Sequence, residues 1–200
     1  MPVLVCFHEG AFLGGGMDVP YQIPTQWVQR SRKHVIVTLQ YRLGLFGFPD
    51  SMALVERNLG LLDQRLAVKW VKQNIAAFGG DPSRIVLWGQ SAGAIAIAHY
   101  SYAYANDPIA TGFIMDSGTE YLLQGRTPPA NSTVSSFSKL AQQVGCNTTS
   151  PTDQLACVRK VPAATLQDSV LSAGELFSPL VDNKNVSQTI QQLLRLLPSL

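Results

Sequence analysis

Charged residues are scarce in this sequence, and long apolar runs are absent from it. Only 14% of the 200 residues are charged, and 15 basic against 13 acidic side chains leave a net charge of +2. These charges form no basic or acidic cluster, which argues against a nucleic-acid partner. No apolar run approaches the ~20 residues that a membrane-spanning helix needs. Because hydrophobic residues still make up 46% of the chain, we expect a sizeable buried core and no transmembrane segment.

The first ten residues, MPVLVCFHEG, lack two marks of a secretory signal peptide. No basic residue opens the segment, and no small-residue cleavage site follows its apolar stretch. We therefore expect no signal peptide in this chain and interpret the segment as a buried strand.

Cysteine is also rare, with three residues in all. Cys6 stands inside the first apolar run, which favours a buried thiol. Cys146 and Cys157 flank a polar loop and could form a bridge. Three N-glycosylation sequons also occur in the second half of the chain, at Asn131, Asn147 and Asn185. Together, the cysteine pair and the sequons favour an origin in the secretory pathway.

The hydrophobic pattern predicts an α/β protein with a mostly parallel central sheet and helices on both faces. Four short apolar runs show no polar alternation, as is typical of strands that are buried on both sides. These predicted strands are 3–7, 35–41, 85–88 and 113–115. The sheet is therefore expected within residues 1–120, and residues 121–200 are expected to form a cover of helices and loops.

Helices are predicted between the strands and throughout the cover. From Leu59 onward, apolar residues recur at three- and four-residue steps, which predicts an amphipathic helix. They are Leu62, Leu66, Trp70, Val71, Ile75 and Phe78. A second, alanine-rich helix is expected from residue 92 to about 105. In the cover, helices are expected near 132–144, 152–160 and 187–197.

The segment Gly89-Gln90-Ser91-Ala92-Gly93 joins a predicted strand to a predicted helix. Gly-x-Ser-x-Gly in this setting is the pattern of a nucleophile elbow. The chain must reverse sharply at the serine, and side chains at the flanking glycines would collide with the neighbouring strand and helix. The following helix directs its free amides at the serine, where they favour negative charge. The pattern therefore predicts that Ser91 is a nucleophile, against the alternative of a tight turn with an incidental serine.

A serine that attacks an ester carbonyl produces an oxyanion, which needs preorganised donors. The amide of Ala92, directly after the nucleophile, is one candidate. The glycine-rich segment FHEGAFLGGG, which begins at the end of the first strand, is the candidate source of the others. One mechanism requires both features, so each supports the other.

The three histidines offer no obvious general base and no metal site. His8 stands where such a loop supplies backbone amides, and no second histidine follows it at zinc-binding spacing. His34 precedes a strand, and His99 lies in the helix after Ser91. No histidine follows His99, although the usual order in this type of fold is serine, acid, histidine. We expect no metal and no cofactor.

Several segments together resemble the type-B carboxylesterase/lipase family, which includes the cholinesterases, and its fungal members above all. The long block from Asn58 to Gly93 is the most specific of them, and 177–186 resembles the segment that leads toward the family's catalytic acid. The segments are PVLVCFHEGAF, YRLGLFGF, NLGLLDQRLAVKWVKQNIAAFGGDPSRIVLWGQSAG, IMDSGT and FSPLVDNKNV. The resemblance implies an α/β-hydrolase fold, of which residues 1–200 would be an incomplete part.

The resemblance also implies roles for particular residues. Ser91 matches the nucleophile, and the amides of Gly10, Ala11 and Ala92 match the oxyanion donors. Cys146 and Cys157 match a family disulfide. The triad acid and histidine are expected outside these 200 residues.

Two positions depart from the family pattern. Ala11 replaces a glycine, which restricts the oxyanion loop. Gln90 replaces a frequent glutamate, which argues against a substrate chosen for a cationic group.

The sequence therefore favours a secreted carboxylic ester hydrolase that acts on small-molecule or lipid esters through an acyl-enzyme. One alternative is a non-catalytic binding or adhesion module on the same fold. Another is an inactive truncated product, which would be poorly soluble because later strands should pair with an exposed sheet edge.

Overall fold

The computed structural model describes residues 1–119 and 135–186 of the chain. Within them, a four-stranded sheet has the order β2-β1-β3-β4, and every neighbouring pair is parallel. The strands are β1 (Val3–Phe7), β2 (Val35–Thr38), β3 (Ile85–Gln90) and β4 (Gly112–Asp116). The α-helices are α1 (Thr25–Ser31), α2 (Gly44–Gly47), α3 (Leu59–Asn74), α4 (Ala92–Ala103), α5 (Ser136–Gln143), α6 (Pro151–Val158) and α7 (Ala163–Ala173). Two 3₁₀ helices, η1 (Pro20–Gln22) and η2 (Ile75–Phe78), complete the described elements.

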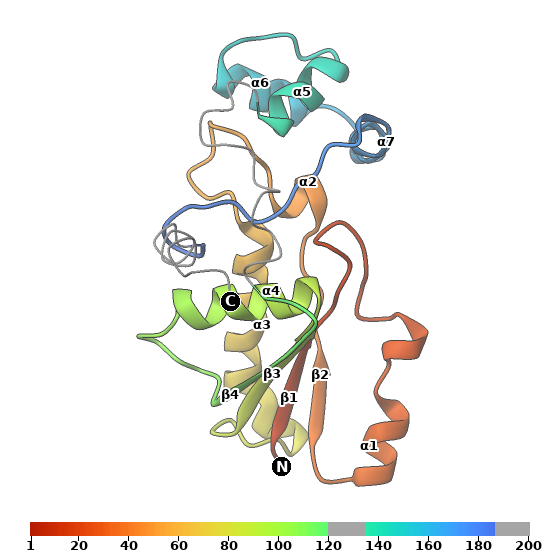
Figure 1. The fold of residues 1–200 in the computed structure, drawn as a ribbon, viewed down its shortest axis with the longest axis vertical. Helices are drawn as coiled ribbons and strands as arrows, with labels where there is room; N and C mark the ends of the chain where they lie inside the picture. Colours follow the sequence, from red (N-terminus) through yellow and green to blue (C-terminus); the bar gives the residue numbers. More distant parts are fainter. Residues whose placement is uncertain (120–134, 187–200) are drawn as a thin grey trace, which may run out of the picture.

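Helices cover both faces of this sheet, which confirms the predicted α/β class and parallel sheet. On one face, Phe7 of β1 packs edge-on against Tyr100 of α4, with ring centroids 6.5 Å apart. On the other face, Trp88 of β3 packs against Trp27 of α1 at 5.8 Å. Figure 1 shows α4 and α1 on these separate sides of the strands.

The order of the strands creates a crevice at their carboxyl ends. The chain leaves β1 for β2 on one side and later returns past β1 to β3 on the other side. Loops that follow β1 and β3 therefore diverge, and such a switch point is where open α/β sheets bind ligands. The predicted oxyanion loop and the predicted elbow both lie at this edge.

The buried face of α3 agrees only in part with the predicted periodicity, since Val71 of α3 and Ile75 just after it are buried and other members of the series are not. Leu66 and Trp70 are exposed, at 68% and 49%, whereas Leu61 and Val68 are buried. The buried side also includes Arg65, whose guanidinium donates to Tyr100 and pairs with Asp107 over the ring of Tyr104. Because this cation is paired inside the fold, polar residues occupy some core positions, and the apolar pattern alone misplaced part of the buried face.

Other predicted boundaries were also wrong. The second strand ends at Thr38 rather than residue 41. Helices α1, α2 and α7 were not predicted, since all are short or lack an apolar period. The expected helix at 187–197 lies outside the described residues.

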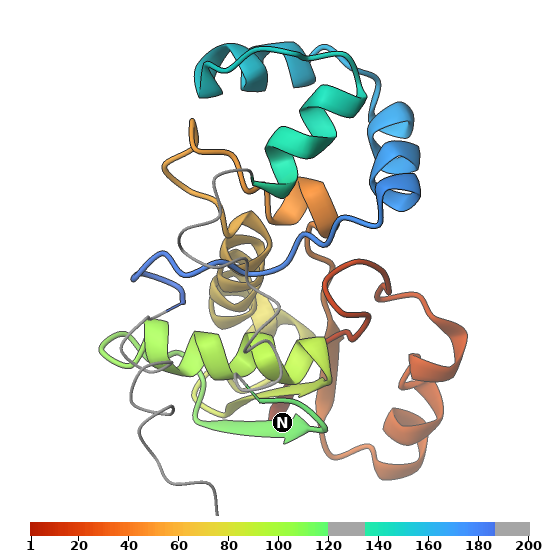
Figure 2. The ribbon, with the colours of Figure 1, turned by 45° about the horizontal axis from the view of Figure 1, so that its top comes forward.

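The cover helices α5, α6 and α7 gather at one end of the molecule, beyond α2 and away from the N-terminus (Figures 1 and 2). A disulfide joins Cys146, which follows α5, to Cys157 in α6. This pairing agrees with the one that the family resemblance implied.

Asn58 ties the cover to the sheet domain across more than 120 residues of chain. Its Nδ2 donates to the Leu180 carbonyl and to Oδ2 of Asp182, each at 2.7 Å, and its Oδ1 accepts from the Leu180 amide at 2.8 Å. The side chain of Asn58 is fully buried. Asp182 in turn accepts from three backbone amides and from Asn185. Residues 180–186 are thus held in one conformation against the start of α3.

Replacement of Asn58 by alanine should lower the free energy of unfolding by about 2–4 kcal/mol, because it leaves several buried partners without a hydrogen bond. Asn74→Ala is the matched control, since Asn74 makes a single side-chain bond, to the Trp70 carbonyl, and should cost less than about 1 kcal/mol. Urea unfolding of both variants measures the difference. Equal losses would show that residues 180–186 are not anchored through Asn58.

His99 makes the stability of the fold dependent on pH. It lies buried on α4, and this burial lowers its pKa to about 4, although the nearby Asp182 carboxylate acts in the opposite direction. The folded state therefore favours the neutral imidazole of His99 over the protonated one. The stability that this preference contributes is lost as pH falls from about 6.5 toward 4. We expect about 2 kcal/mol of this contribution to disappear between pH 7 and pH 5.

His99→Met should remove that part of the pH dependence, because the variant has no imidazole to protonate. The measurement is the slope of unfolding free energy against pH for both proteins, which is unaffected by any constant packing cost. Parallel slopes would contradict a buried neutral His99.

Candidate active site

Ser91 is a single-residue junction between β3, which ends at Gln90, and α4, which begins at Ala92. Its backbone has φ 51° and ψ −116°, a strained conformation for a residue with a side chain. The Ser91 amide donates to the Asp116 carbonyl at 2.8 Å, and the Ser91 carbonyl accepts from Ile95 at 3.0 Å. Bonds on both sides therefore hold this strain in place.

The glycines that flank Ser91 are required by close backbone contacts. A Cβ at Gly89 would lie 2.5 Å from the backbone of Gly93. At Gly93, a Cβ would lie 2.1 Å from the Phe7 carbonyl oxygen. A Cβ at Gly118, beyond β4, would lie 2.3 Å from the Ser91 carbonyl oxygen. The elbow is thus wedged between the ends of β1 and β4.

The loop after β1 has three consecutive residues with positive φ. Gly10, Ala11 and Phe12 have φ values of 107°, 56° and 63°. The loop turns back on itself, since the Gly10 carbonyl accepts from Leu13 and Gly14. Alanine is thus accommodated at the position that departs from the family's glycine.

The oxyanion candidates from the two segments lie at one edge of the sheet. Gly93 packs against the carbonyls of Phe7 and His8, which brings the start of the loop beside the elbow. Within the described residues, the amides of Gly10, Ala11 and Ala92 have no hydrogen-bond acceptor. These three N–H groups are therefore the candidates for binding an anion at this edge of the sheet.

His8 supports this loop through its ring. The imidazole stacks on Tyr41 with centroids 4.2 Å apart, and Tyr41 donates to the His8 carbonyl at 3.0 Å. Nδ1 of His8 lies 2.8 Å from the Glu9 carbonyl, so it carries the hydrogen. Burial lowers the pKa of His8, which favours the neutral ring. In the described part of the chain, no hydrogen bond joins a histidine to Ser91.

Asp116, at the end of β4, is a supporting residue that the sequence did not reveal. Its carbonyl accepts from Ser91, and its carboxylate accepts from the Trp88 indole at 2.5 Å. Its backbone contacts Ser91 and its side chain contacts Trp88, so Asp116 links the elbow to the face of the sheet on which Trp88 lies. Only the register of β3 with β4, which pairs Gln90 with Asp116, brings them together.

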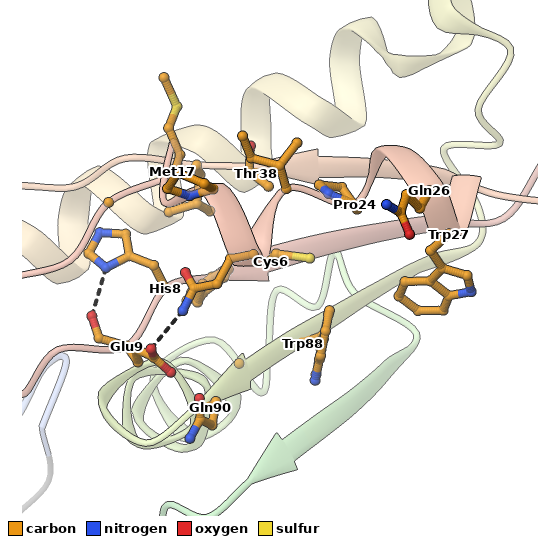
Figure 3. Close-up of a pocket in the computed structure, with 17 residues that line it drawn as sticks. Cys6, His8, Glu9, Met17, Pro24, Gln26, Trp27, Thr38, Trp88 and Gln90 are labelled. Atoms are coloured by element: carbon orange, nitrogen blue, oxygen red, sulfur yellow. Dashed lines mark hydrogen bonds between the residues drawn. The ribbon is translucent and has the colours of Figure 1, made fainter. Parts of the chain in front are cut away.

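A hollow of about 520 Å³ opens beside the elbow, on the face of the sheet opposite α4. Figure 3 shows His8, Glu9 and Gln90 at one end and Trp27 and Trp88 at the other. Its size is within the range of small-molecule sites. The thiol of Cys6 also lines it, and burial raises the pKa of that thiol to about 12, which makes it a poor nucleophile.

Within residues 1–119 and 135–186, no group of three or more His, Cys, Asp or Glu side chains could hold a metal ion. None of the helices there combines the length and apolarity that a bilayer crossing requires.

The three sequons differ in their surroundings. Asn147 is exposed, beside the disulfide. Asn185 is only 7% exposed, and its amide nitrogen donates to Asp182. A glycan on Asn185 would not fit this packing, so Asn147 is the site at which the glycosylation prediction stays reasonable. Asn131 lies outside the described residues.

Comparison with protein families gives a match over almost the whole chain. Residues 1–198 match the model of the carboxylesterase family. The chain belongs to the carboxylesterase family. The strands and helices described above are accordingly part of its α/β-hydrolase fold.

Named relatives of this carboxylesterase-family chain include fungal and animal enzymes. It is 46% identical over 188 residues to chlorogenic acid esterase of Aspergillus niger, covering 92% of this chain and 36% of the relative. It is 48% identical over 172 residues to secreted lipase 5 of Gibberella zeae, covering 84% and 32%. Carboxylesterase 5A of the cat is 36% identical over 189 residues, covering 92% and 33%. The chain thus spans about a third of the length of these relatives.

Gly93→Ala should destabilise the chain by about 3 kcal/mol or more, because the new methyl meets backbone that cannot move aside. Gly14→Ala is the matched control, since a Cβ at Gly14, on the oxyanion loop, meets nothing within 4 Å. Chemical unfolding and soluble yield of the two variants give the comparison. A Gly93→Ala protein as stable as Gly14→Ala would contradict the wedged elbow.

Proposed function

We propose that this chain carries the nucleophile and the oxyanion hole of a carboxylic ester hydrolase. The observation that carries the proposal is the strained backbone of Ser91 between β3 and α4, beside a loop with three consecutive positive φ values. Strain of this kind persists only where the surrounding structure enforces it, and it is concentrated at functional sites. Membership of the carboxylesterase family supports the same reading.

In the proposed reaction, Ser91 Oγ attacks the acyl carbon of an ester. The carbonyl oxygen becomes an oxyanion and accepts hydrogen bonds from the amides of Gly10, Ala11 and Ala92. Collapse of the tetrahedral intermediate expels the alcohol and leaves an acyl-enzyme, which water hydrolyses. The N-terminus of α4 adds a favourable field for the negative charge.

We assign neither the general base nor the carboxylate that would orient it to a residue of this chain. His8 is engaged by Tyr41 and Glu9, and His99 is buried in α4. We propose that both missing groups lie in other parts of a longer hydrolase domain. The isolated chain should then hydrolyse esters at no more than a residual rate.

The relatives' names guide the choice of substrates and of location. A chlorogenic acid esterase and a secreted lipase are similar to this chain to nearly the same degree. We therefore propose a secreted enzyme, and a substrate panel that includes an aromatic-acid ester and an acylglycerol. Gln90, in place of a carboxylate beside the nucleophile, favours neutral esters.

A non-catalytic binding module of the same fold is the alternative function. Such a protein would have no need to keep a serine at φ 51° between two sterically required glycines. The hydrolase is therefore the better supported of the two.

The test supplies the missing groups by grafting. Residues 1–200 replace the matched region of the Aspergillus niger chlorogenic acid esterase, and the graft is assayed on 4-nitrophenyl butyrate. We expect turnover that falls by at least about 10⁴-fold in Ser91→Ala, because no other group replaces the nucleophile. Ser172→Ala, an exposed serine on α7, should have no effect. A folded graft without turnover would contradict the proposal.

A further inference from the structure

The oxyanion candidates Gly10 and Ala11 lie between two residues that contact the same aromatic ring. Tyr41, which follows β2, stacks on the imidazole of His8 with ring centroids 4.2 Å apart. The ring of Phe12 meets Tyr41 edge-on at 6.5 Å. Phe12 is completely buried, and Tyr41 is nearly so. Tyr41 therefore contacts the loop after β1 on both sides of the two donors.

The hydroxyl of Tyr41 holds the beginning of this loop beside the elbow. It donates to the His8 carbonyl at 3.0 Å, inside the fold. A Cβ at Gly93 would lie 3.1 Å from the same carbonyl oxygen. The peptide group that accepts the hydrogen bond of the tyrosine is thus also one that packs against the first turn of α4.

The backbone next to Tyr41 is fixed by other elements, so the tyrosine can set the position of the loop. A Cβ at Gly47 of α2 would lie 2.1 Å from the Arg42 carbonyl oxygen, and one at Gly60 of α3 would lie 2.6 Å from it. The Arg42 guanidinium also makes two hydrogen bonds of 2.7 Å to Asp63 of α3. The segment that carries Tyr41 is therefore held between α2 and α3.

The far end of the loop is attached to the same region of the fold. The Gly44 amide at the start of α2 donates to the Phe12 carbonyl at 2.7 Å, and α2 lies beside the loop in both views of the ribbon (Figures 1 and 2). Between the two ends, the Gly10 carbonyl accepts from Leu13 and Gly14, which closes the turn within the loop. Three consecutive positive φ values persist only with such support from the surroundings.

Small shifts of this loop matter for the proposed reaction. Oxyanion donors act when they lie about 2.7–3.1 Å from the developing charge, and the loss of one donor costs ~10²–10³ in rate. A misplacement of about 1 Å can cost ~10²-fold even when its cause lies away from the reacting atoms. Tyr41 itself is not among the residues that line the hollow, so its effect on the reaction would pass through the loop.

We propose that Tyr41 is a positioning residue of the oxyanion hole, which holds the amides of Gly10 and Ala11 in register with the amide of Ala92. This proposal rests on the proposed ester hydrolase. The hydroxyl fixes the peptide group at the near end of the loop, and the ring supports the residues on either side of the donors. Because the tyrosine does not touch the substrate, its loss should weaken binding of the oxyanion far more than binding of the planar ester.

The experiment compares Tyr41→Phe and Tyr41→Leu in the grafted enzyme. Tyr41→Phe keeps the ring and removes the hydrogen bond, so kcat on 4-nitrophenyl butyrate should fall about tenfold while KM stays within about twofold. Tyr41→Leu also removes the stacked ring and should lower kcat by about 100-fold. An alkyl trifluoromethyl ketone, whose adduct with Ser91 carries an oxyanion, should lose affinity by the same factors as kcat.

Tyr104→Phe is the matched control. It removes a tyrosine hydroxyl that donates to Asn185 at 3.2 Å, at the opposite end of α4 from Ser91. This variant should keep the kcat and the ketone affinity of the unmutated graft. Thermal unfolding measures what each substitution costs in stability, which separates a loss of packing from a loss of positioning.

The outcomes distinguish this proposal from the hydrolase proposal. A Tyr41→Phe enzyme that changes only in thermal stability, or only in KM, would overturn the positioning role and leave the hydrolase proposal standing. Because Tyr41→Phe keeps the shape of the core, it decides the question even if Tyr41→Leu does not fold. A folded, unmutated graft without turnover would overturn both proposals.

Discussion

The close contact between the elbow and the end of β1 is the constraint on which the candidate site depends. Gly93 lies so near the Phe7 carbonyl that no side chain fits between them. This contact places the loop after β1 beside Ser91, and β4 closes the other side through the bond from Ser91 to the Asp116 carbonyl. The strain at Ser91 is thus maintained by three parallel strands at once, which is why the sheet and the site cannot be separated.

A second set of contacts holds the cover against the sheet domain. Asn58 and Asp182 join segments more than 120 residues apart. Within the sheet domain, Arg65 of α3 is buried among Tyr100, Tyr104 and Asp107. These polar contacts are specific in geometry, because each buried group must find its partner. Residues 180–186, which resemble the approach to the family's catalytic acid, are therefore fixed relative to α3 and α4.

The sequence predicted the sheet well and the polar contacts poorly. Apolar runs without polar alternation, such as 3–7 and 85–88, predicted the buried parallel strands, because both faces of such strands are covered. The glycines around Ser91 predicted the elbow, because close backbone contacts leave no room for side chains there. The exposure of Trp70 was not foreseen, because the pattern of apolar residues cannot show that Arg65 is paired inside the fold. Asp116 was missed as a supporting residue because its contact with Ser91 depends on the register of β3 with β4.

The most direct test of the central claim is covalent labelling of the grafted enzyme with a fluorophosphonate, followed by mass spectrometry of its peptides. The reagent reacts with serines that are activated within a complete site. The account predicts one adduct, on Ser91, that disappears in Ser91→Ala. A folded graft that takes no label, or that is labelled on a different serine, would contradict the assignment of Ser91 as the nucleophile.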